Sequence, residues 1–214
     1  MARINEGFLS GFRGKIGNIV GCKTKTGYYI RKLPAKSMKP PTVKQLTQRT
    51  KFKLAQAFLV PLRPLLQSLP LSVEKKMFAY SAACSQLVRE AIPGLYPDQA
   101  IDYALVKLTS GNLHKGCDHM VTVSESCLNF SWCHGMDCIF QDLAVLLAYD
   151  PLENHWIYQV IMVGAGCRSA TLNLTPDFTG RKVETWMYFF SYGGQAVSEG
   201  VYTGRHHVNV QMSK

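Results

Sequence analysis

Cysteine and histidine gather in one stretch of this 214-residue sequence, Cys117 to Cys138, which reads CDHMVTVSESCLNFSWCHGMDC. Thiolate and imidazole are ligands that zinc prefers, and a structural zinc site needs four of them in a tetrahedron, usually with pairs of cysteines two residues apart. Here the spacings are Cys-x-His and Cys-His-x3-Cys, with β-prone runs between them. Because alternate strand residues point to opposite faces, we expect reduced thiols that bind no metal.

Nucleophilic catalysis by a cysteine would be a second use of these residues. It requires a thiol activated by a histidine within hydrogen-bond reach. Cys133 and His134 are neighbours in sequence, which does not establish a contact between their side chains. A phosphate-binding GxxxxGK[ST] loop is also absent, since GFRGKIGN (residues 11–18) lacks the spacing and the hydroxyl of that motif. We therefore predict no catalytic residues, no cofactor and no enzymatic activity.

Positive charge is concentrated at the N-terminal end of the chain. Residues 1–53 contain thirteen Lys or Arg and one acid, Glu6, which gives +12. Residues 54–214 contain eleven bases and thirteen acids, which gives −2 and a total of +10. A solvated charged face normally mixes both signs. Because this segment hardly mixes them, the charge favours an acidic partner: a nucleic-acid backbone, an anionic membrane surface or the acidic face of another subunit.

This basic segment predicts a nucleic-acid interface, with cations on phosphates and aromatic rings stacked on unpaired bases. The residues expected there are Lys15, Lys23, Lys25, Tyr28, Tyr29, Arg31, Lys32, Lys36, Lys39, Lys44 and Arg49. Only one of the two tyrosines should face a given groove, because neighbouring strand residues point in opposite directions. No base-reading motif is present, so we expect binding to RNA or single-stranded DNA without sequence preference.

The elements that would carry these side chains begin with a β-hairpin arm over residues 11–33. KIGNIVGCKT and YYIRKL are short β-prone runs, and Gly27 between them can take the positive φ of a tight turn. A two-stranded ribbon is marginal by itself, so we expect it to add to an edge of a neighbouring subunit. The proline-rich LPAKSMKPP indicates an extended linker, and residues 1–41 form the first predicted domain.

A helical segment is predicted over residues 42–101. Thr42 is a candidate N-cap, and apolar residues recur at helical spacing in VKQLTQRTKFKLAQAFL. Pro61 ends or kinks this helix, and RPLLQSL restarts it. A further helix is expected from about residue 72 to residue 92, and the faces of these helices should pack on each other.

Residues 102–214 change to short runs of β-branched and aromatic residues between turn residues. The runs are YALVKLT, HMVTVS, CLNFSW, LAVLLAY, HWIYQVIMV, SATLNLT, VETWMYFF and AVSEGVY. Strands at this spacing are typical of an antiparallel sandwich of the immunoglobulin or fibronectin type. The predicted fold class is therefore α+β, with a basic β-hairpin arm, a short helical pair and a C-terminal β-sandwich.

Five passages of the sequence are distinctive: GKIGNIVG, YYIRKLP, KPPTVKQLTQRTKFKLAQAFLVPL, AIPGLYPDQAIDYALVKLTSGNL and VETWMYFFSYGGQAVSEGVYTG. Together they resemble a family of domains of unknown function that is abundant in Bacteroidota, over nearly the whole chain. The resemblance implies an N-terminal ribbon, a helical pair and a fibronectin-like end, and it implies no particular activity. The chain departs from the family pattern in its cysteines and histidines between Cys117 and Cys138.

These features predict a non-enzymatic structural protein that assembles with copies of itself through the arm, into a filament or a phage-like particle. The arm should also bind nucleic acid, since an anion would neutralise the repulsion between repeated basic segments. The alternative is a monomeric binding module whose sandwich loops recognise a protein or glycan and whose arm docks on an anionic surface. A hydrolase that uses cysteine and histidine ranks last.

The N-terminus MARINEGFLSGFRGK has no uninterrupted apolar stretch of the length that a secretion signal needs. No run approaches the roughly 18 apolar residues of a membrane helix. Seven scattered cysteines do not form a dense disulfide framework. We expect synthesis in the cytoplasm, no membrane insertion, and release as an assembled particle or filament.

Overall fold

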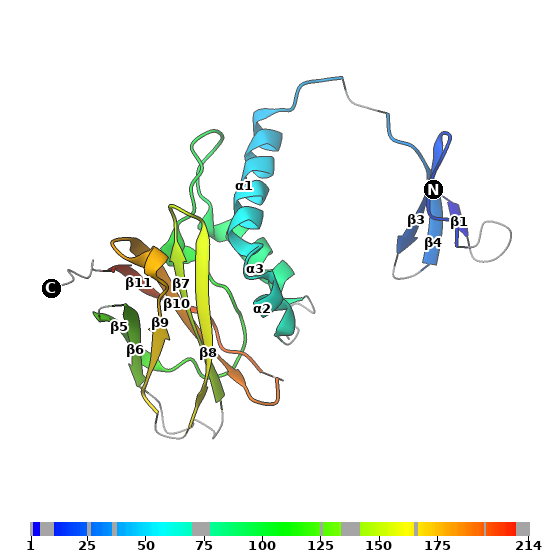
Figure 1. Cartoon of the computed structure of the whole chain (residues 1–214). Helices are drawn as coiled ribbons and strands as arrows, with labels where there is room; N and C mark the ends of the chain where they lie inside the picture. Colours follow the sequence, from blue (N-terminus) through cyan, green and yellow to red (C-terminus); the bar gives the residue numbers. More distant parts are fainter. Residues whose placement is uncertain are drawn as a thin grey trace. The chain divides into compact units, whose positions relative to one another are not determined.

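Two units, Met1–Pro41 and Thr42–Lys214, each form their own set of internal contacts in this computed structural model (Figure 1). The structure describes residues 2–4, 11–24, 27–35, 38–69, 78–124, 126–133, 142–164, 167–194 and 196–208. Within these residues, no helix combines the length and the apolar character needed to span a bilayer.

The first unit is a four-stranded antiparallel sheet in the order β1-β4-β3-β2. Its strands are β1 (Ala2–Ile4), β2 (Gly14–Ile16), β3 (Ile19–Thr24) and β4 (Gly27–Lys32). The predicted hairpin is present as β3 and β4, and Gly27 adopts a φ of +132° where β4 begins. The sequence reasoning did not foresee β1 and β2, which add one short strand to each edge of the hairpin.

Phe12 packs closely on Gly21 in this sheet. A Cβ atom at position 21 would lie 2.5 Å from Cδ1 of Phe12 and 2.6 Å from its backbone oxygen, so only glycine permits the contact. Elsewhere the described side chains of the sheet are half-buried or exposed, and those of Ile16 and Ile19 are 58% and 39% exposed. The described side chains therefore bury little apolar surface, and a sheet needs a hydrophobic face for independent stability.

The second unit contains a sandwich of two antiparallel sheets, in the orders β11-β10-β7-β8 and β5-β6-β9 (Figure 1). The strands are β5 (Cys117–Ser124), β6 (Cys127–Cys133), β7 (Asp142–Asp150), β8 (His155–Val163), β9 (Ser169–Asn173), β10 (Lys182–Ser191) and β11 (Val201–His207). This is the architecture of an immunoglobulin- or fibronectin-like sandwich, so the predicted α+β fold class is confirmed.

Two of the predicted strands are wrong. Within YALVKLT, residues Tyr103–Leu105 form a 3-10 turn, η2, because the Asp102 side chain caps it by accepting a hydrogen bond from the Ala104 backbone at 3.1 Å. AVSEGVY forms only isolated bridges before β11 begins at Val201. There the hydroxyl of Ser198 accepts a hydrogen bond from the backbone of Phe189 at 2.8 Å, in place of regular ladder pairing.

The helices are α1 (Val43–Leu59), α2 (Arg63–Ser68) and α3 (Ala79–Gln86). Helix α3 continues as a π-helical turn, η1 (Leu87–Ala91). A 3-10 turn, η3 (Pro176–Phe178), precedes β10. Thr42 caps α1 as predicted. Its hydroxyl accepts from the backbone of Gln45 at 3.4 Å, and the Gln45 side chain accepts from the backbone of Thr42 at 3.1 Å. Much of the first turn predicted for the third helix lies outside the described residues.

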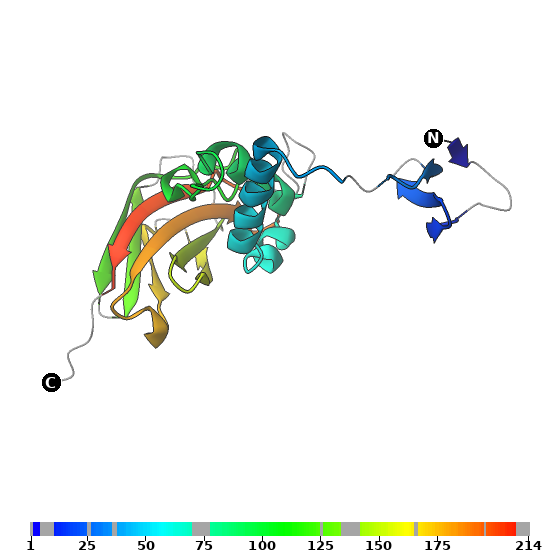
Figure 2. The ribbon, with the colours of Figure 1, turned by 90° about the horizontal axis from the view of Figure 1, so that it is seen from above.

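The helices cover one face of the four-stranded sheet, so residues 42–214 form three layers (Figures 1 and 2). Strand β7 shows how the layers are joined. Val145, Leu147 and Tyr149 belong to the core shared with the helices, whereas the alternate residues from Ala144 to Ala148 belong to the core shared with β6 and β9. A strand buried on both faces has a continuous apolar run, as LAVLLAY is. The helical segment and the sandwich therefore share a core.

Phe58 of α1 lies in the centre of an aromatic cluster. Its ring centroid is 4.9 Å from those of Tyr149 and Trp156, and 6.0 Å from those of Tyr103 and Trp186. The indole nitrogen of Trp156 also donates to the backbone oxygen of Phe58 at 2.9 Å. These contacts fix the C-terminal half of α1 on the sheet.

Replacement of Phe58 by alanine should lower the free energy of unfolding by about 3–5 kcal/mol, because it removes a ring whose neighbours cannot collapse fully into the space. Urea denaturation followed by tryptophan fluorescence measures the loss. The matched control is Phe52→Ala on the same helix, where the side chain is 53% exposed and the change should stay within about 0.5 kcal/mol. Equal losses in the two variants would contradict an anchoring role for Phe58.

Candidate nucleic-acid interface

The predicted nucleic-acid contacts are distributed over a sheet, a linker and a helix. In the first unit the structure places Lys15 on β2, Lys23 on β3, Tyr28, Tyr29, Arg31 and Lys32 on β4, and Lys39 in the linker. Lys44 and Arg49 lie on α1, in the second unit. Lys25 and Lys36 lie outside the described residues.

One face of the N-terminal sheet carries Tyr28, Lys23 and Lys32. The register pairs Tyr28 with Lys23, and Lys32 with Ile19, which is itself paired with Ile16. The ammonium of Lys23 lies 5.8 Å from the centre of the Tyr28 ring. An exposed cation–π contact is worth about 0.5–1 kcal/mol, and a stacked base about 1–3 kcal/mol, so a base can displace the ammonium and leave it free to reach a phosphate.

The opposite face carries Tyr29, Arg31 and Lys15. Here the register pairs Tyr29 with Cys22, and Arg31 with Val20, whose other neighbour is Lys15. A hydrogen bond with Cys22 raises the pKa of Tyr29, and the charge of Arg31 opposes the shift. The phenol is therefore neutral at physiological pH and does not repel phosphate. The two tyrosines lie on opposite faces, as the alternation of strand residues predicts.

Helix α1 continues the basic character into the second unit. Its seventeen residues include Lys44, Arg49, Lys51 and Lys53 and no acid. Lys44 lies in the first turn, where the helix dipole favours a negative side chain and disfavours a cation. Helix stability therefore does not account for Lys44, whose side chain is exposed to solvent.

The cysteine and histidine stretch is partly brought together by the β5–β6 hairpin. Cys117 and Cys133 are direct partners in the register, a convergence that the sequence reasoning did not predict. Cys127 lies at the other end of β6, and His134 and Cys138 lie outside the described residues. Within the described part of the chain, no group of three or more His, Cys, Asp or Glu side chains is arranged to hold a metal ion.

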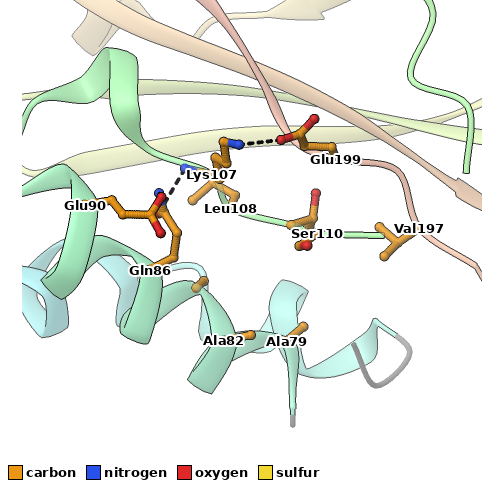
Figure 3. A pocket seen from close by; sticks show the side chains of 11 residues that line it. Ala79, Ala82, Gln86, Glu90, Lys107, Leu108, Ser110, Val197 and Glu199 are labelled. Atoms are coloured by element: carbon orange, nitrogen blue, oxygen red, sulfur yellow. Dashed lines mark hydrogen bonds and ion pairs between the residues drawn. The ribbon is translucent and has the colours of Figure 1, made fainter. Parts of the chain in front are cut away.

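A cavity of about 160 Å³ lies between α3 and the sandwich (Figure 3). Small alanine side chains of α3 form one wall, and Lys107 and Glu199 lie across from them in the figure. Gln86 donates to the backbone oxygen of Leu105 at 2.8 Å and accepts from the backbone of Lys107 at 3.2 Å. Its amide also donates to the carboxylate of Glu90 at 3.2 Å, so these polar groups satisfy one another.

Glu199 holds two lysines beside this cavity. Its carboxylate oxygens lie 2.6 Å from the ammonium of Lys107 and 2.7 Å from that of Lys115. The hydrogen bond from Lys107, and then that from Lys115, lower the pKa of Glu199 to about 2. The sequence reasoning missed this cluster, because Glu199 is distant in sequence from both lysines and no local pattern links them. Its geometry is that of a structural clamp between the start of the sandwich and the approach to β11.

Residues 11–204 match a family described as a family of unknown function. This chain belongs to DUF6266. The DUF6266 match begins in the first unit and ends within β11, so strands β2 to β4, the linker, the helices and the sandwich up to Gly204 are part of the family region. No curated protein matches the sequence.

Three solved structures are similar in chain trace to about half of this DUF6266 member. The fn3 domain of the human collagen alpha-1(XX) chain is 13% identical over 49% of this chain and 95% of its own, with a TM-score of 0.36. A computer-redesigned β-sandwich protein is 16% identical over 48% of this chain and 97% of its own, with a TM-score of 0.35. The FN1–FN3 domains of chicken CNTN1 are 16% identical over 47% of this chain and 33% of their own, with a TM-score of 0.36.

The Glu199 cluster gives the stability of the protein a dependence on acid pH. Because the pKa of Glu199 falls from its ordinary 4.5 to about 2, the carboxylate stabilises the folded state fully above pH 4.5 and loses that effect as the pH falls through 2. Solvent and salt screen this partly exposed group. The difference in free energy of unfolding between the wild type and Glu199→Gln, measured in urea, should therefore shrink over that window. A constant difference would contradict the assignment.

Proposed function

We propose that this chain is a non-enzymatic structural protein whose basic N-terminal unit binds the backbone of RNA or single-stranded DNA and joins copies of the chain. One observation carries the proposal: the two units differ in charge. Residues 1–41 contain nine Lys or Arg and one acid, giving +8, and residues 42–214 contain fifteen and thirteen, giving +2, for a total of +10. One carboxylate cannot neutralise nine cations, so an outside anion would relieve their repulsion.

The kinds of cation favour backbone binding over base recognition. Six of the nine are lysines, whose ammonium groups act as compact point charges on flexible stems, whereas the bidentate reading of a base favours arginine. Lys23 and Lys32 lie on one face of the sheet, and Lys15 and Arg31 on the other. A flexible single strand can contact such a sheet with phosphates on lysines and a base on the tyrosine of the same face.

Assembly is supported by the exposed apolar side chains of the N-terminal sheet. Ile16 and Ile19 are paired across β2 and β3 and are largely open to solvent. Strand β2 is also an edge of its sheet, where backbone groups have no partner strand among the described residues. An edge with an apolar face is a template for pairing with another chain.

Strand β8 of the sandwich has the features expected of an edge that would receive this arm. β8 is one of the two edge strands of the sheet β11-β10-β7-β8, and its sequence HWIYQVIMV contains no Asp, Glu, Lys, Arg or Pro. Proteins usually protect exposed edges with charges or prolines. The side chains of Tyr158, Val160 and Met162, at alternate positions, are 42%, 42% and 58% exposed. We therefore assign β8 as the edge to which the arm of a neighbouring copy adds.

Affinity for a homopolymeric single strand should fall with salt, because binding to phosphates releases counterions. With four to six contacts per chain, log affinity against log salt should have a slope of about −3 to −4. Lys23→Gln with Lys32→Gln, or Lys15→Gln with Arg31→Gln, should flatten the slope by about 1.4 on whichever face contacts the strand, equally for unrelated sequences. Fluorescence anisotropy over a salt series measures this.

The matched control for that titration replaces exposed cations of the sandwich, Arg168→Gln with Lys182→Gln. This pair should leave the slope unchanged. A full-length protein without salt-sensitive binding to RNA or DNA, or an equal loss in the control, would contradict the nucleic-acid proposal.

Deletion of residues 1–33 should leave a folded monomer at concentrations where the full chain assembles, because the joining strand is gone while the second unit keeps its cores. Light scattering and electron microscopy measure the size. Val160→Lys on β8 should have the same effect with the arm intact, because it places a charge on the receiving edge. If the truncated chain assembles like the full one, the arm is not the connector. A full chain that is monomeric throughout would favour the monomeric binding module instead.

A further inference from the structure

Cys117 and Cys133 face each other across the β5–β6 ladder. Cys117 begins β5, Cys133 ends β6, and the register pairs them directly. The sulfur of Cys117 lies 3.5 Å from the backbone oxygen of Cys133, to which it donates. Both residues are exposed, and β5 is the edge strand of its sheet, so a reagent in solvent can reach them.

The other described cysteines lie in different surroundings. Cys84 is buried, Cys127 is paired with Ser124 at the opposite end of the hairpin, and Cys22 is paired with Tyr29 in the first unit. The Cys167 sulfur donates to the backbone oxygen of Ser169 at 3.2 Å. Within the described ladders, no second pair of cysteines is in register.

The local backbone permits the approach that a sulfur–sulfur bond needs. Directly opposite residues of antiparallel strands have Cβ atoms about 4.5–5.5 Å apart, and a disulfide needs about 3.5–4.5 Å. The pairing register shifts between Cys117 and Met120, and Asp118 adopts a φ of 49°. Cys117 therefore lies beside a bulge at a strand end, where a movement of about 1 Å does not disturb a regular ladder.

We infer that Cys117 and Cys133 form a thiol–disulfide site that exchanges with small-molecule disulfides of the glutathione type. One protein thiolate attacks a sulfur of the small disulfide, forms a mixed disulfide and releases one small thiol. The second protein thiolate then attacks the mixed disulfide, forms the Cys117–Cys133 bond and releases the other small thiol. The protein pair loses two electrons and two protons, and the small disulfide gains both.

The surroundings of Cys117 affect its reactivity in this exchange. Desolvation, and then the charge of Asp118, raise the pKa of Cys117, which lowers its fraction of thiolate. Because the thiolate is the nucleophile, this shift slows attack by Cys117 on a disulfide.

The test equilibrates the full-length protein with mixtures of reduced and oxidised glutathione, followed by acid quench and peptide mapping without reduction. The wild type should give a peptide that links Cys117 to Cys133, and its melting temperature should rise by about 5 °C, because the bond restricts the unfolded chain. Cys127→Ser, in the same hairpin, is the matched control and should keep the link. Cys117→Ser and Cys133→Ser should each abolish this link, and the remaining thiol of the pair should accumulate as a mixed disulfide with glutathione.

Two results would overturn the inference. In one, both thiols remain open to alkylation in the most oxidising mixture. In the other, the mapped link joins Cys133 to Cys138, or to any cysteine other than Cys117. The ladder register would then not determine which thiols react.

Discussion

The packing of Phe58 against Tyr149, Trp156 and Trp186 is the contact on which the second unit depends. It fixes the helices on a sheet face that would otherwise expose two tryptophans to water. Monomeric soluble proteins rarely expose large apolar patches. A sandwich can usually leave its outer faces polar, because one core between the sheets suffices. Here the four-stranded sheet has a core on each face, so the helices complete the fold and are not an appendage.

A buried carboxylate accompanies this packing. Glu184 on β10 has no exposed surface, and its oxygens accept from the hydroxyl of Tyr202 at 2.5 Å and from Arg205 at 2.6 Å. A buried charge is costly unless it is paired and hydrogen-bonded, so the pairing of β10 with β11 must keep these groups together. Tyr202 also packs on Trp186, which connects the polar pair to the aromatic cluster. Register and core packing thus support the same strand alignment.

The elements with local signals could be predicted from the sequence. Thr42 with Gln45 is a capping box, and β7 and β8 are long runs of β-prone residues. The shared core was not predicted, although the unbroken apolar run of β7 is typical of a strand buried on both faces. The Cys117–Cys133 pairing depends on a bulge that alters the register, and Glu199 meets its lysines only through the fold. Neither the cysteine pairing nor the Glu199 cluster leaves a pattern in nearby residues, because both depend on the pairing of residues that are distant in sequence.

The two units are stabilised in different ways, and the difference bears on the proposed function. The second unit has two cores and nearly balanced charge, so its own packing supplies much of its stability. The first unit has the close contact of Phe12 on Gly21, exposed isoleucines and nine cations against one acid, and a fold of about 40 residues usually needs a metal, disulfides or association. Apolar contact with a neighbouring edge would supply burial, and an anionic strand would supply neutralisation. The proposed assembly and the proposed binding of nucleic acid thus rest on the same features that leave this unit with little stability of its own.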